Sequence, residues 1–258
     1  NEIAYIQYTS GSTRFPRGVL ITEDAVLENL TGIARHGLKL TPEDRFFSWL
    51  PFYHDMGLIG KVLTPLSCQL SVDYLGTREF AMRPRLWLEL MTRTRCTVSF
   101  GPPFGYELCA RRLREGDLPR YDLSHWRHAG AGAEMIRPEV LHAFSELLGP
   151  SGFREEAFLP CYGMAECSLA ISFAPLDEPF AVDEVDADHL SRTGEAIPAS
   201  ELTEPGRTRQ FALCGEPLPG YQIEIRDGAG ERLPERRSGT IFVRGPSVMS
   251  GYFNEPKI

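Results

Sequence analysis

A short stretch rich in hydroxyl groups lies near the start of the chain. It consists of Thr9, Ser10, Gly11, Ser12 and Thr13. The hydroxyls can donate hydrogen bonds to an anion, and the glycine between them allows a positive φ that brings backbone N–H groups close to a ligand. The composition therefore predicts a phosphate-binding loop, although an ordinary solvated Ser/Thr turn has the same composition.

The rest of the same loop contains four more residues that favour a phosphate-binding role. Arg14 and Arg17 add positive charge in a planar group that suits phosphate oxygens. Pro16 restricts the backbone angles of the turn, and Gly18 allows the backbone a wider range of angles where the turn ends. Apolar runs before and after the loop predict a strand on each side. The loop lacks the Gly-Lys-Ser/Thr ending of P-loop enzymes, so a phosphate site here would be of another kind.

A histidine and an aspartate form a second candidate site. His54 and Asp55 lie between Pro51 and Gly57, directly after a short apolar strand. Ligands of open α/β sheets bind at the carboxyl ends of strands, which is where such a loop would lie. A single histidine is also common as a structural residue, so the residue types leave both interpretations open.

Two glycine-containing motifs follow later strands. Residues 130–134 read Gly-Ala-Gly-Ala-Glu, but the third glycine of a dinucleotide-binding fingerprint would fall on Met135, so that motif is not met. Residues 162–166 read Tyr-Gly-Met-Ala-Glu, and the carboxylate of Glu166 is a hard oxygen ligand of the kind that Mg²⁺ prefers. Each motif could also be a simple turn after a strand.

The elements that would position these motifs alternate between strand and helix up to about residue 170. Alternation of this kind predicts an α/β fold with a mainly parallel sheet and flanking helices. We interpret the first strand as a central one. Apolar patterns predict helices at 22–36, 58–66, 85–93, 106–114 and 138–148, and strands at 3–8, 46–50, 70–74, 97–100 and 126–129.

The last third of the chain differs in composition and in its pattern of apolar residues. Residues 174–210 are rich in acidic residues, proline and alanine and show little apolar periodicity. Alternating residues at 221–226 and 239–244 predict the start of a small antiparallel β-subdomain. The chain is therefore divided into an α/β core at 1–173, an acidic insertion-like segment at 174–210 and the start of a β-subdomain at 211–258.

Composition narrows the class of function. The 258 residues carry a net charge of −8, which argues against sequence-independent binding to nucleic acid. The six cysteines include no Cys-x-x-Cys pair, which favours reduced thiols in a cytoplasmic protein over a zinc site or disulfides. No apolar run has the length needed to span a membrane.

Taken in order, the motifs resemble those of the adenylate-forming superfamily, which includes acyl-CoA synthetases, luciferases and nonribosomal adenylation domains. Residues 9–18, Thr-Ser-Gly-Ser-Thr-x-x-Pro-x-Gly, resemble its ATP loop. Residues 130–134 resemble its adenine-binding turn, and residues 162–166 resemble its Tyr-Gly-x-Thr/Ala-Glu motif. The resemblance covers nearly the whole chain. It implies part of the N-terminal domain of such an enzyme, with ATP and Mg²⁺ as cofactors.

The resemblance also implies a role for each motif. His54 would lie where an acyl tunnel meets the nucleotide and would orient or electrostatically support a carboxylate, without acting as a general base. Tyr162 would stack near the adenine and Glu166 would hold Mg²⁺, so His54 and Glu166 are the expected catalytic residues. Weaker candidates for contact with the acyl chain are Phe100, Phe104 and Gly105. The expected nucleotide-binding residues are Thr9, Ser10, Gly11, Ser12, Thr13, Arg17, Gly18, Gly132, Ala133, Glu134, Tyr162, Gly163, Met164 and Ala165.

Three details resemble fatty-acyl-AMP ligases more than acyl-CoA synthetases. Arg14 and Arg17 replace residues that are common in the ATP loop, the segment from His54 to Gly60 has the ligase form, and the acidic segment coincides with a family-specific insertion. This resemblance implies that a fatty carboxylate attacks the α-phosphate of Mg·ATP to give acyl-AMP. The acyl group would then pass to an acyl carrier protein of a polyketide or lipopeptide synthase. The alternatives are a long-chain acyl-CoA synthetase and a non-catalytic nucleotide- or acyl-binding module.

The two ends suggest a piece of a longer chain. Asn1 directly precedes a predicted strand, and Ile258 follows a loop with no closing element. The resemblance implies further parts that this chain lacks: the beginning of the large domain, a ribose-binding aspartate and a C-terminal lid domain with a catalytic lysine. We therefore expect the isolated piece to turn over poorly or not at all.

Overall fold

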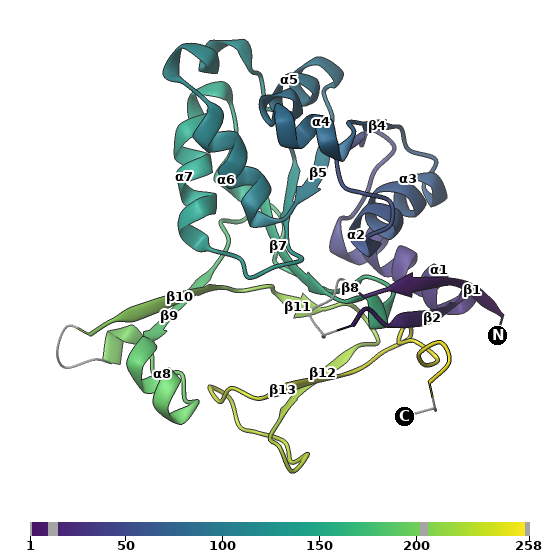
Figure 1. The fold of residues 1–258 in the computed structure, drawn as a ribbon. Coiled ribbons are helices and arrows are strands. Elements are labelled where there is room, and N and C mark those ends of the chain that lie inside the picture. The colour runs from purple at the N-terminus through teal and green to yellow at the C-terminus, as the bar shows by residue number, and fades with distance from the viewer. Residues whose placement is uncertain (1, 10–14, 202–205, 256–258) are drawn as a thin grey trace.

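The computed structural model describes residues 2–9, 15–201 and 206–255, and a seven-stranded sheet lies at its centre (Figure 1). The strand order is β11-β8-β7-β6-β5-β3-β4, and the run from β4 to β7 is parallel. β8 and β11 pair antiparallel at one edge. The predicted α/β fold with a mainly parallel sheet is confirmed. The strands are β3 (Phe46–Ser48), β4 (Val72–Tyr74), β5 (Val98–Gly101), β6 (His128–Ala131), β7 (Phe158–Gly163), β8 (Ala170–Phe173) and β11 (Glu216–Pro217).

Successive strand residues point to opposite faces of this sheet, and each face has its own core. Phe46 packs in a cluster with Ile59 and Phe100, whereas Phe47 packs in the cluster around Trp87 on the other face. β3, β5 and β6 are buried along their whole length, as expected of central parallel strands that are covered on both sides. The two cores hold the carboxyl ends of the strands in place.

Helices cover both faces (Figure 1). The cluster around Trp87 lies under α5, α6 and α7, and the Trp87 indole N–H donates to the Ser99 hydroxyl at 2.9 Å. Within the described residues, no helix is both long and apolar enough to cross a membrane. The helices are α1 (Glu23–Thr31), α2 (Asp55–Leu58), α3 (Thr64–Ser67), α4 (Thr77–Met82), α5 (Arg85–Thr94), α6 (Pro103–Arg112), α7 (Pro138–Leu148) and α8 (Ala187–Thr193), with π-helical turns at Gly32–Gly37 and Ile59–Leu63.

Local sequence signals explain which helix ends were predicted well. α7 has the predicted bounds, because Pro138 suits the first helical turn and Gly149 follows the last. The predicted N-cap of α1 is confirmed, since the Thr22 hydroxyl accepts from the Ala25 N–H at 3.2 Å. α6 begins at Pro103 rather than at residue 106, because proline is also tolerated at the first helical position there.

The first two strands form a separate antiparallel hairpin. β1 (Ile3–Tyr8) pairs with β2 (Gly18–Thr22), and neither strand joins the seven-stranded sheet. The interpretation of β1 as a central strand is therefore wrong for the part of the chain that the structure describes. β1 is largely exposed, while Val19 and Ile21 of β2 are fully buried against the core on the α1 side.

Two further strand pairs extend away from the main sheet (Figure 1). β9 (Val182–Asp186) and β10 (Thr208–Ala212) pair antiparallel, and α8 lies between them in the sequence. These elements were not predicted, because the strands are mostly polar and Val185 is the fully buried residue of β9. β12 (Gln222–Arg226) and β13 (Thr240–Arg244) form the predicted antiparallel pair. The proposed domain boundaries remain predictions.

Candidate active site

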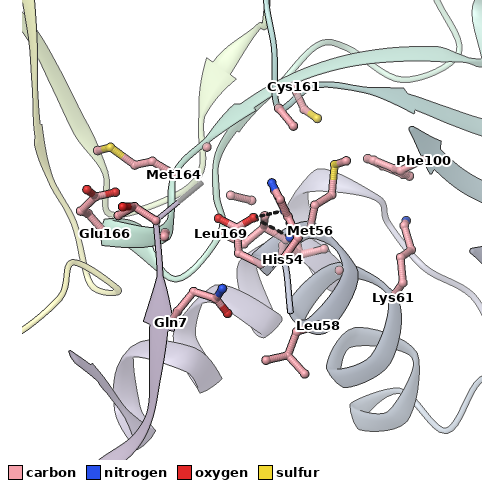
Figure 2. Close-up of a pocket in the computed structure, with 18 of the residues that line it drawn as sticks. Gln7, His54, Met56, Leu58, Lys61, Phe100, Cys161, Met164, Glu166 and Leu169 are labelled. Atoms are coloured by element: carbon pink, nitrogen blue, oxygen red, sulfur yellow. Dashed lines mark hydrogen bonds and ion pairs between the residues drawn. The ribbon is translucent and has the colours of Figure 1, made fainter. Parts of the chain in front are cut away.

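A cavity of about 1110 Å³ lies beside the carboxyl ends of the parallel strands (Figure 2). The β1–β2 hairpin, the loop before α2, and the end of β7 contribute to its wall. This is the place where ligands bind in open α/β sheets. The cavity brings together the following expected site residues: Thr9, His54, Phe100, Ala133, Tyr162, Gly163, Met164, Ala165 and Glu166.

His54 is held in one position by its neighbours. Its Nδ1 lies 2.6 Å from Asp55 Oδ1, and this carboxylate oxygen also accepts from the Met56 N–H at 2.6 Å. The contact with the Asp55 carboxylate raises the pKa of His54. Gly57 makes the loop possible, because a Cβ there would lie 2.1 Å from the Pro51 carbonyl oxygen. The arrangement places a readily protonated imidazole in the wall of the cavity.

The motif at 162–166 bends sharply as it leaves β7. Gly163 approaches the Leu169 backbone so closely that a Cβ would lie 1.9 Å from the Leu169 carbonyl oxygen. The Met164 N–H donates to the same oxygen at 2.8 Å and closes the bend. Residues 162–166 therefore all line the cavity, with the Glu166 carboxylate at its edge (Figure 2).

Glu166 is bound by a residue from the far end of the chain. The Tyr252 hydroxyl donates to Glu166 Oε1 at 2.8 Å, and the Met249 N–H donates to the Glu166 carbonyl oxygen at 2.7 Å. Burial, and then the hydrogen bond to Glu166, raise the pKa of Tyr252 to about 12. The tyrosine therefore stays protonated and acts as the donor. This contact was not predicted, because no local pattern links two residues so far apart in the sequence.

The base of the hydroxyl-rich loop is closed by two hydrogen bonds. The Thr9 N–H donates to the Arg17 carbonyl oxygen at 3.0 Å, and the Arg17 N–H donates to the Thr9 hydroxyl at 3.0 Å. Ser10, Gly11, Ser12 and Thr13 lie outside the described residues.

Arg17 and Gly18 do not line the cavity. The Arg17 guanidinium lies 3.3 Å from the centre of the Tyr252 ring and forms an ion pair with Glu255. Gly18 is the first residue of β2, and its carbonyl oxygen accepts from the Phe253 N–H at 2.7 Å. The segment 252–255 thus covers this side of the loop.

The turn after β6 is only partly exposed to the cavity. Ala133 lines the cavity and has a positive φ of 66°. Gly132 packs on Cys161, where a Cβ would lie 3.0 Å from its sulfur. Glu134 points elsewhere: its Oε1 accepts from the Phe104 N–H at 2.8 Å and caps the start of α6. The strand itself includes Gly130 and Ala131, which the prediction had placed in the turn.

Phe104 and Gly105 do not lie in the cavity wall, in contrast to the expectation of contact with an acyl chain. The reason is the early start of α6, which turns Gly105 toward Trp49. A Cβ on Gly105 would lie 2.6 Å from the Trp49 ring, and the Phe104 ring packs edge-on against the same indole at 6.0 Å. Of the three predicted acyl-contact residues on this segment, the structure brings Phe100 alone to the cavity.

Lys61 is the main residue of the cavity that the sequence analysis missed. It is 1% exposed, and its Nζ lies 3.5 Å from the centre of the Phe100 ring. Burial lowers its pKa well below the usual value. A lysine within the apolar run 58–63, two helical turns after His54, was the available signal, because that spacing predicts the same helix face.

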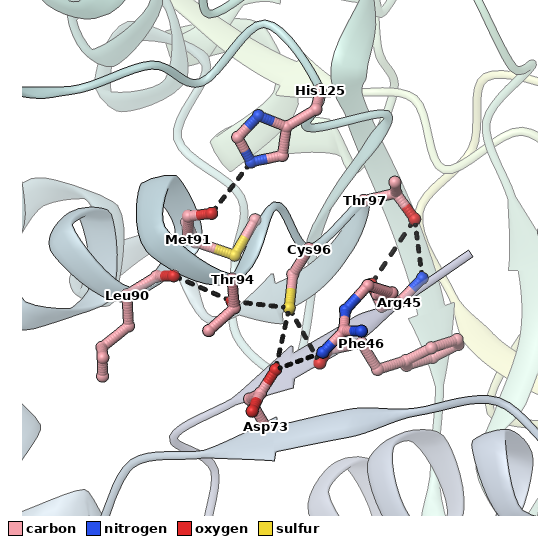
Figure 3. Close-up of polar contacts among 9 residues, drawn as sticks. All are labelled: Arg45, Phe46, Asp73, Leu90, Met91, Thr94, Cys96, Thr97 and His125. Carbon is pink, nitrogen blue, oxygen red and sulfur yellow. Dashed lines mark hydrogen bonds and ion pairs between the residues drawn. The ribbon is translucent and has the colours of Figure 1, made fainter. Parts of the chain in front are cut away.

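A polar network at the opposite edge of the sheet has a structural role (Figure 3). The Arg45 guanidinium pairs with Asp73 at 3.2 Å, and the Cys96 thiol donates to the Phe46 carbonyl oxygen at 3.2 Å. His125 contacts the Met91 carbonyl oxygen through Nε2 at 2.9 Å.

All six cysteines lie in the described ranges and are free thiols. No cluster of three or more His, Cys, Asp or Glu side chains suited to a metal ion occurs in those ranges.

Residues 1–253 match the family described as AMP-binding enzyme. A Caulobacter vibrioides (strain NA1000 / CB15N) protein, provisionally named an acyl-CoA synthetase, is 50% identical over 253 residues, which are 98% of this chain and 44% of the relative. A medium-chain-fatty-acid–acyl-carrier-protein ligase of Teredinibacter turnerae (strain ATCC 39867 / T7901) is 36% identical over 261 residues, which are 100% of this chain and 40% of the relative.

The chain also resembles a solved structure, in both sequence and fold. That structure comes from a study of fatty acyl-adenylate ligases from E. coli and L. pneumophila, is 54% identical and has a TM-score of 0.95. The match covers 99% of this chain and 46% of that chain. The chain thus spans less than half the length of these relatives. The predicted resemblance to adenylate-forming enzymes is confirmed, and the chain belongs to the AMP-binding enzyme family.

Proposed function

We propose that the protein to which this chain belongs uses ATP to convert a fatty acid into an acyl adenylate. The observation that carries the proposal is the division of a single cavity. Met164 and Glu166 of the 162–166 motif lie at the side expected to hold the nucleotide, and Phe100 lies at the opposite side (Figure 2). His54 lies between them. Thr9, Ala133 and Met56 line the same cavity. A charged headgroup and an apolar tail could occupy such a cavity together.

The reaction would be an in-line substitution at phosphorus. A carboxylate oxygen of the fatty acid forms a bond to the α-phosphorus, the bond to the bridging oxygen of the β-phosphate breaks, and pyrophosphate leaves with the electron pair. His54 would orient the attacking carboxylate, since its contact with Asp55 favours the charged imidazolium. We assign no proton transfer to it, because a carboxylate nucleophile needs no general base. Positioning and charge stabilisation supply most of the rate enhancement in such reactions.

Glu166 is the residue that would hold Mg²⁺. A single carboxylate at the edge of the cavity fits this ion, which usually takes one or two protein carboxylates and completes its octahedral shell with phosphates and water. The ion would supply positive charge to the phosphates. Tyr252 would fix the orientation of the Glu166 carboxylate, and Thr9 and the hydroxyl-rich loop would contact the phosphates. Arg17 would join them on release from its ion pair with Glu255.

We further propose that the acyl group passes to the phosphopantetheine thiol of an acyl carrier protein, in polyketide or lipopeptide synthesis. The Teredinibacter ligase, whose name includes this type of acceptor, supports the proposal. The second candidate acceptor is CoA, and the name of the 50% identical Caulobacter protein favours it. The two acceptors predict different products and can be separated in one experiment.

The experiment uses the full-length protein that its gene encodes. It is incubated with Mg·ATP, a medium-chain fatty acid, and either CoA or a phosphopantetheinylated carrier protein, and the products are identified by mass. We expect acyl-AMP and pyrophosphate, with onward transfer to the carrier protein. Rapid formation of acyl-CoA would support the second candidate, and the absence of adenylate with any fatty acid would refute the proposal.

Variants test the role of the cavity in the same assay. Glu166→Gln and His54→Ala should each reduce pyrophosphate release, while His142→Ala should not. His142 lies on α7, is half-buried against the Phe180 ring and pairs with Glu155 at 3.0 Å outside the cavity, so it controls for the loss of a histidine as such.

A further inference from the structure

Lys61 carries a buried side-chain amino group with no polar partner in the described ranges. It is 1% exposed, and none of the hydrogen bonds or ion pairs found among residues 2–9, 15–201 and 206–255 involves its amino group. Its backbone is well anchored, because the Lys61 carbonyl oxygen accepts from the Tyr74 hydroxyl at 2.9 Å. Leaving an amino group unpaired in an apolar environment is costly, so such a group calls for a ligand.

The immediate surroundings of the amino group are apolar. Nζ lies 3.5 Å from the centre of the Phe100 ring and 5.0 Å from that of Phe46, so two aromatic rings face it. Cys161 is the nearby titratable group, but burial raises the pKa of its thiol to about 12 and keeps it neutral. The thiol therefore supplies no negative charge to balance an ammonium group. Lys61 is one of the residues that line the cavity, and we take its amino group to be within reach of a bound ligand.

The position of Lys61 separates it from the part of the cavity expected to hold phosphate. Figure 2 shows Lys61 reaching toward Phe100 at one side of the view, with Glu166 at the other side and His54 between them. Lys61 lies seven residues after His54, beyond α2 and within the π-helical turn Ile59–Leu63, so the two side chains reach the cavity at different places. A chain whose carboxylate lies at His54 could therefore extend past Lys61 before it ends.

We propose that Lys61 binds an oxygen acceptor carried along the acyl chain, so that the cavity selects fatty acids with a hydroxyl, keto or second carboxyl group over unsubstituted ones. The proposal rests on the proposed function, because it takes the occupant to be a fatty acid. An unsubstituted alkyl chain would leave the amino group unpaired beside Phe100. An oxygen at the matching carbon would accept a hydrogen bond from it and remove that cost.

The test compares wild type with Lys61→Met in the full-length protein. Methionine keeps an unbranched side chain of similar length and removes the donor. Pyrophosphate release is measured with octanoic and decanoic acids and with the same acids bearing a hydroxyl at successive carbons or a terminal second carboxyl group. We expect wild type to prefer one substituted acid by about tenfold to a hundredfold in kcat/KM. Lys61→Met should lose this preference and use the unsubstituted acids at least as well as wild type.

Leu63→Met is the matched control. Leu63 ends the same π-helical turn, is partly buried against the core on the same face of the sheet and does not line the cavity. This variant should retain the wild-type preference. A Lys61→Met variant with unchanged selectivity would overturn the proposal and leave the proposed function standing.

Binding without ATP separates the two proposals. Titration calorimetry with the preferred substituted acid should give heat with wild type and much weaker binding with Lys61→Met. If no acid supports pyrophosphate release but binding still depends on Lys61, the proposed function fails and the assignment of Lys61 survives. If binding is the same in both proteins, the assignment fails.

The melting temperature of Lys61→Met shows whether the variant is folded. Removing an unpaired buried amino group should leave the melting temperature of the ligand-free protein equal to that of wild type or higher. A fall of several degrees would mean that Lys61 is paired by another part of the protein, and that result would overturn the proposal.

Discussion

Tyr252 and Glu166 are joined by a hydrogen bond of 2.8 Å from the tyrosine hydroxyl to the carboxylate oxygen Oε1. The contact joins the motif at the end of β7 to the segment after β13. Because the same tyrosine ring lies under the Arg17 guanidinium at 3.3 Å, one side chain contacts two residues that are expected to act on the phosphates of ATP. The position of Tyr252 therefore couples the carboxylate expected to hold Mg²⁺ to the arginine of the loop.

Tyr252→Phe should weaken the response to Mg²⁺. The substitution removes the donor to Glu166 and keeps the ring under Arg17, so it isolates the hydrogen bond. Loss of a residue that orients a metal ligand typically lowers metal affinity about 10- to 100-fold. Pyrophosphate release measured against Mg²⁺ concentration at saturating ATP should show a half-saturation point raised by about that factor. An unchanged Mg²⁺ dependence would contradict the role assigned to this hydrogen bond.

Arg17→Ala should raise the KM for ATP by about tenfold, since a charge-assisted contact with phosphate is lost. The KM for the fatty acid should stay the same. Glu255→Gln is the informative companion, because it frees Arg17 from its ion pair and should lower the KM for ATP. Equal changes in both KM values would instead indicate that the loop had rearranged. Steady-state kinetics with each substrate varied in turn distinguishes these results.

The KM for the fatty acid should rise with pH as His54 loses its proton. Its contact with Asp55 raises the pKa of His54 above the usual value of 6.5. The stabilisation from this contact is therefore fully present below pH 6.5 and disappears as the pH rises through the higher pKa of the folded protein. A carboxylate oriented by the imidazolium loses that support over the same pH range. The pH profile of kcat/KM for the fatty acid, at constant saturating ATP, measures this change.

Two variants check the assignment of this pH dependence. Asp55→Asn removes the carboxylate that raises the pKa, so the rise in KM should move to lower pH. His54→Asn removes the titrating group, so this pH dependence should vanish. Persistence of the same profile in His54→Asn would show that another group is responsible.

Gly163→Ala should destabilise the fold by about 2–3 kcal/mol. A Cβ at this position would lie 1.9 Å from the Leu169 carbonyl oxygen, and backbone cannot give way as a flexible side chain can. Gly149→Ala is the matched control, because no atom lies within 4 Å of a Cβ there and its backbone has right-handed helical angles. That change should be neutral or slightly stabilising. Urea unfolding of both variants gives the comparison, and equal midpoints would contradict the prediction.

The fold class and the order of the motifs could be predicted because they depend on local residue types. Alternating strands and helices indicate a parallel sheet wherever they occur, and Pro138 with Gly149 bounds α7 without reference to the rest of the chain. The His54 loop and the 162–166 motif come from strands of the parallel sheet, so the rule for open sheets predicts that these sites lie at the same end of it. The phosphate-like loop follows β1, which lies outside that sheet, yet Thr9 lines the same cavity as eight other expected site residues.

The tertiary structure decided the features that depend on contacts between distant residues. β1 is apolar enough to be a central strand, yet its pairing with β2 leaves it outside the main sheet. Gly105 follows Phe104 and Phe100 in the sequence, but the early start of α6 directs it to Trp49 instead of the cavity. Small shifts in where a helix begins rotate every later side chain, and sequence patterns locate helix ends only within a few residues.

Lys61 is the clearest example of a residue whose environment depends on the folded structure. In the sequence it is one basic residue in an apolar helix, and most such residues reach solvent by extending their long side chains. Whether it reaches solvent or a cavity depends on what packs above it, and here Phe46 and Phe100 from two different strands face its amino group. The sequence alone determined the family's motifs and the fold class, because these depend on residue types within short segments of the chain. The partners of Lys61, Glu166 and Arg17 were decided by the folded structure, because burial and hydrogen bonding depend on residues that only folding brings together.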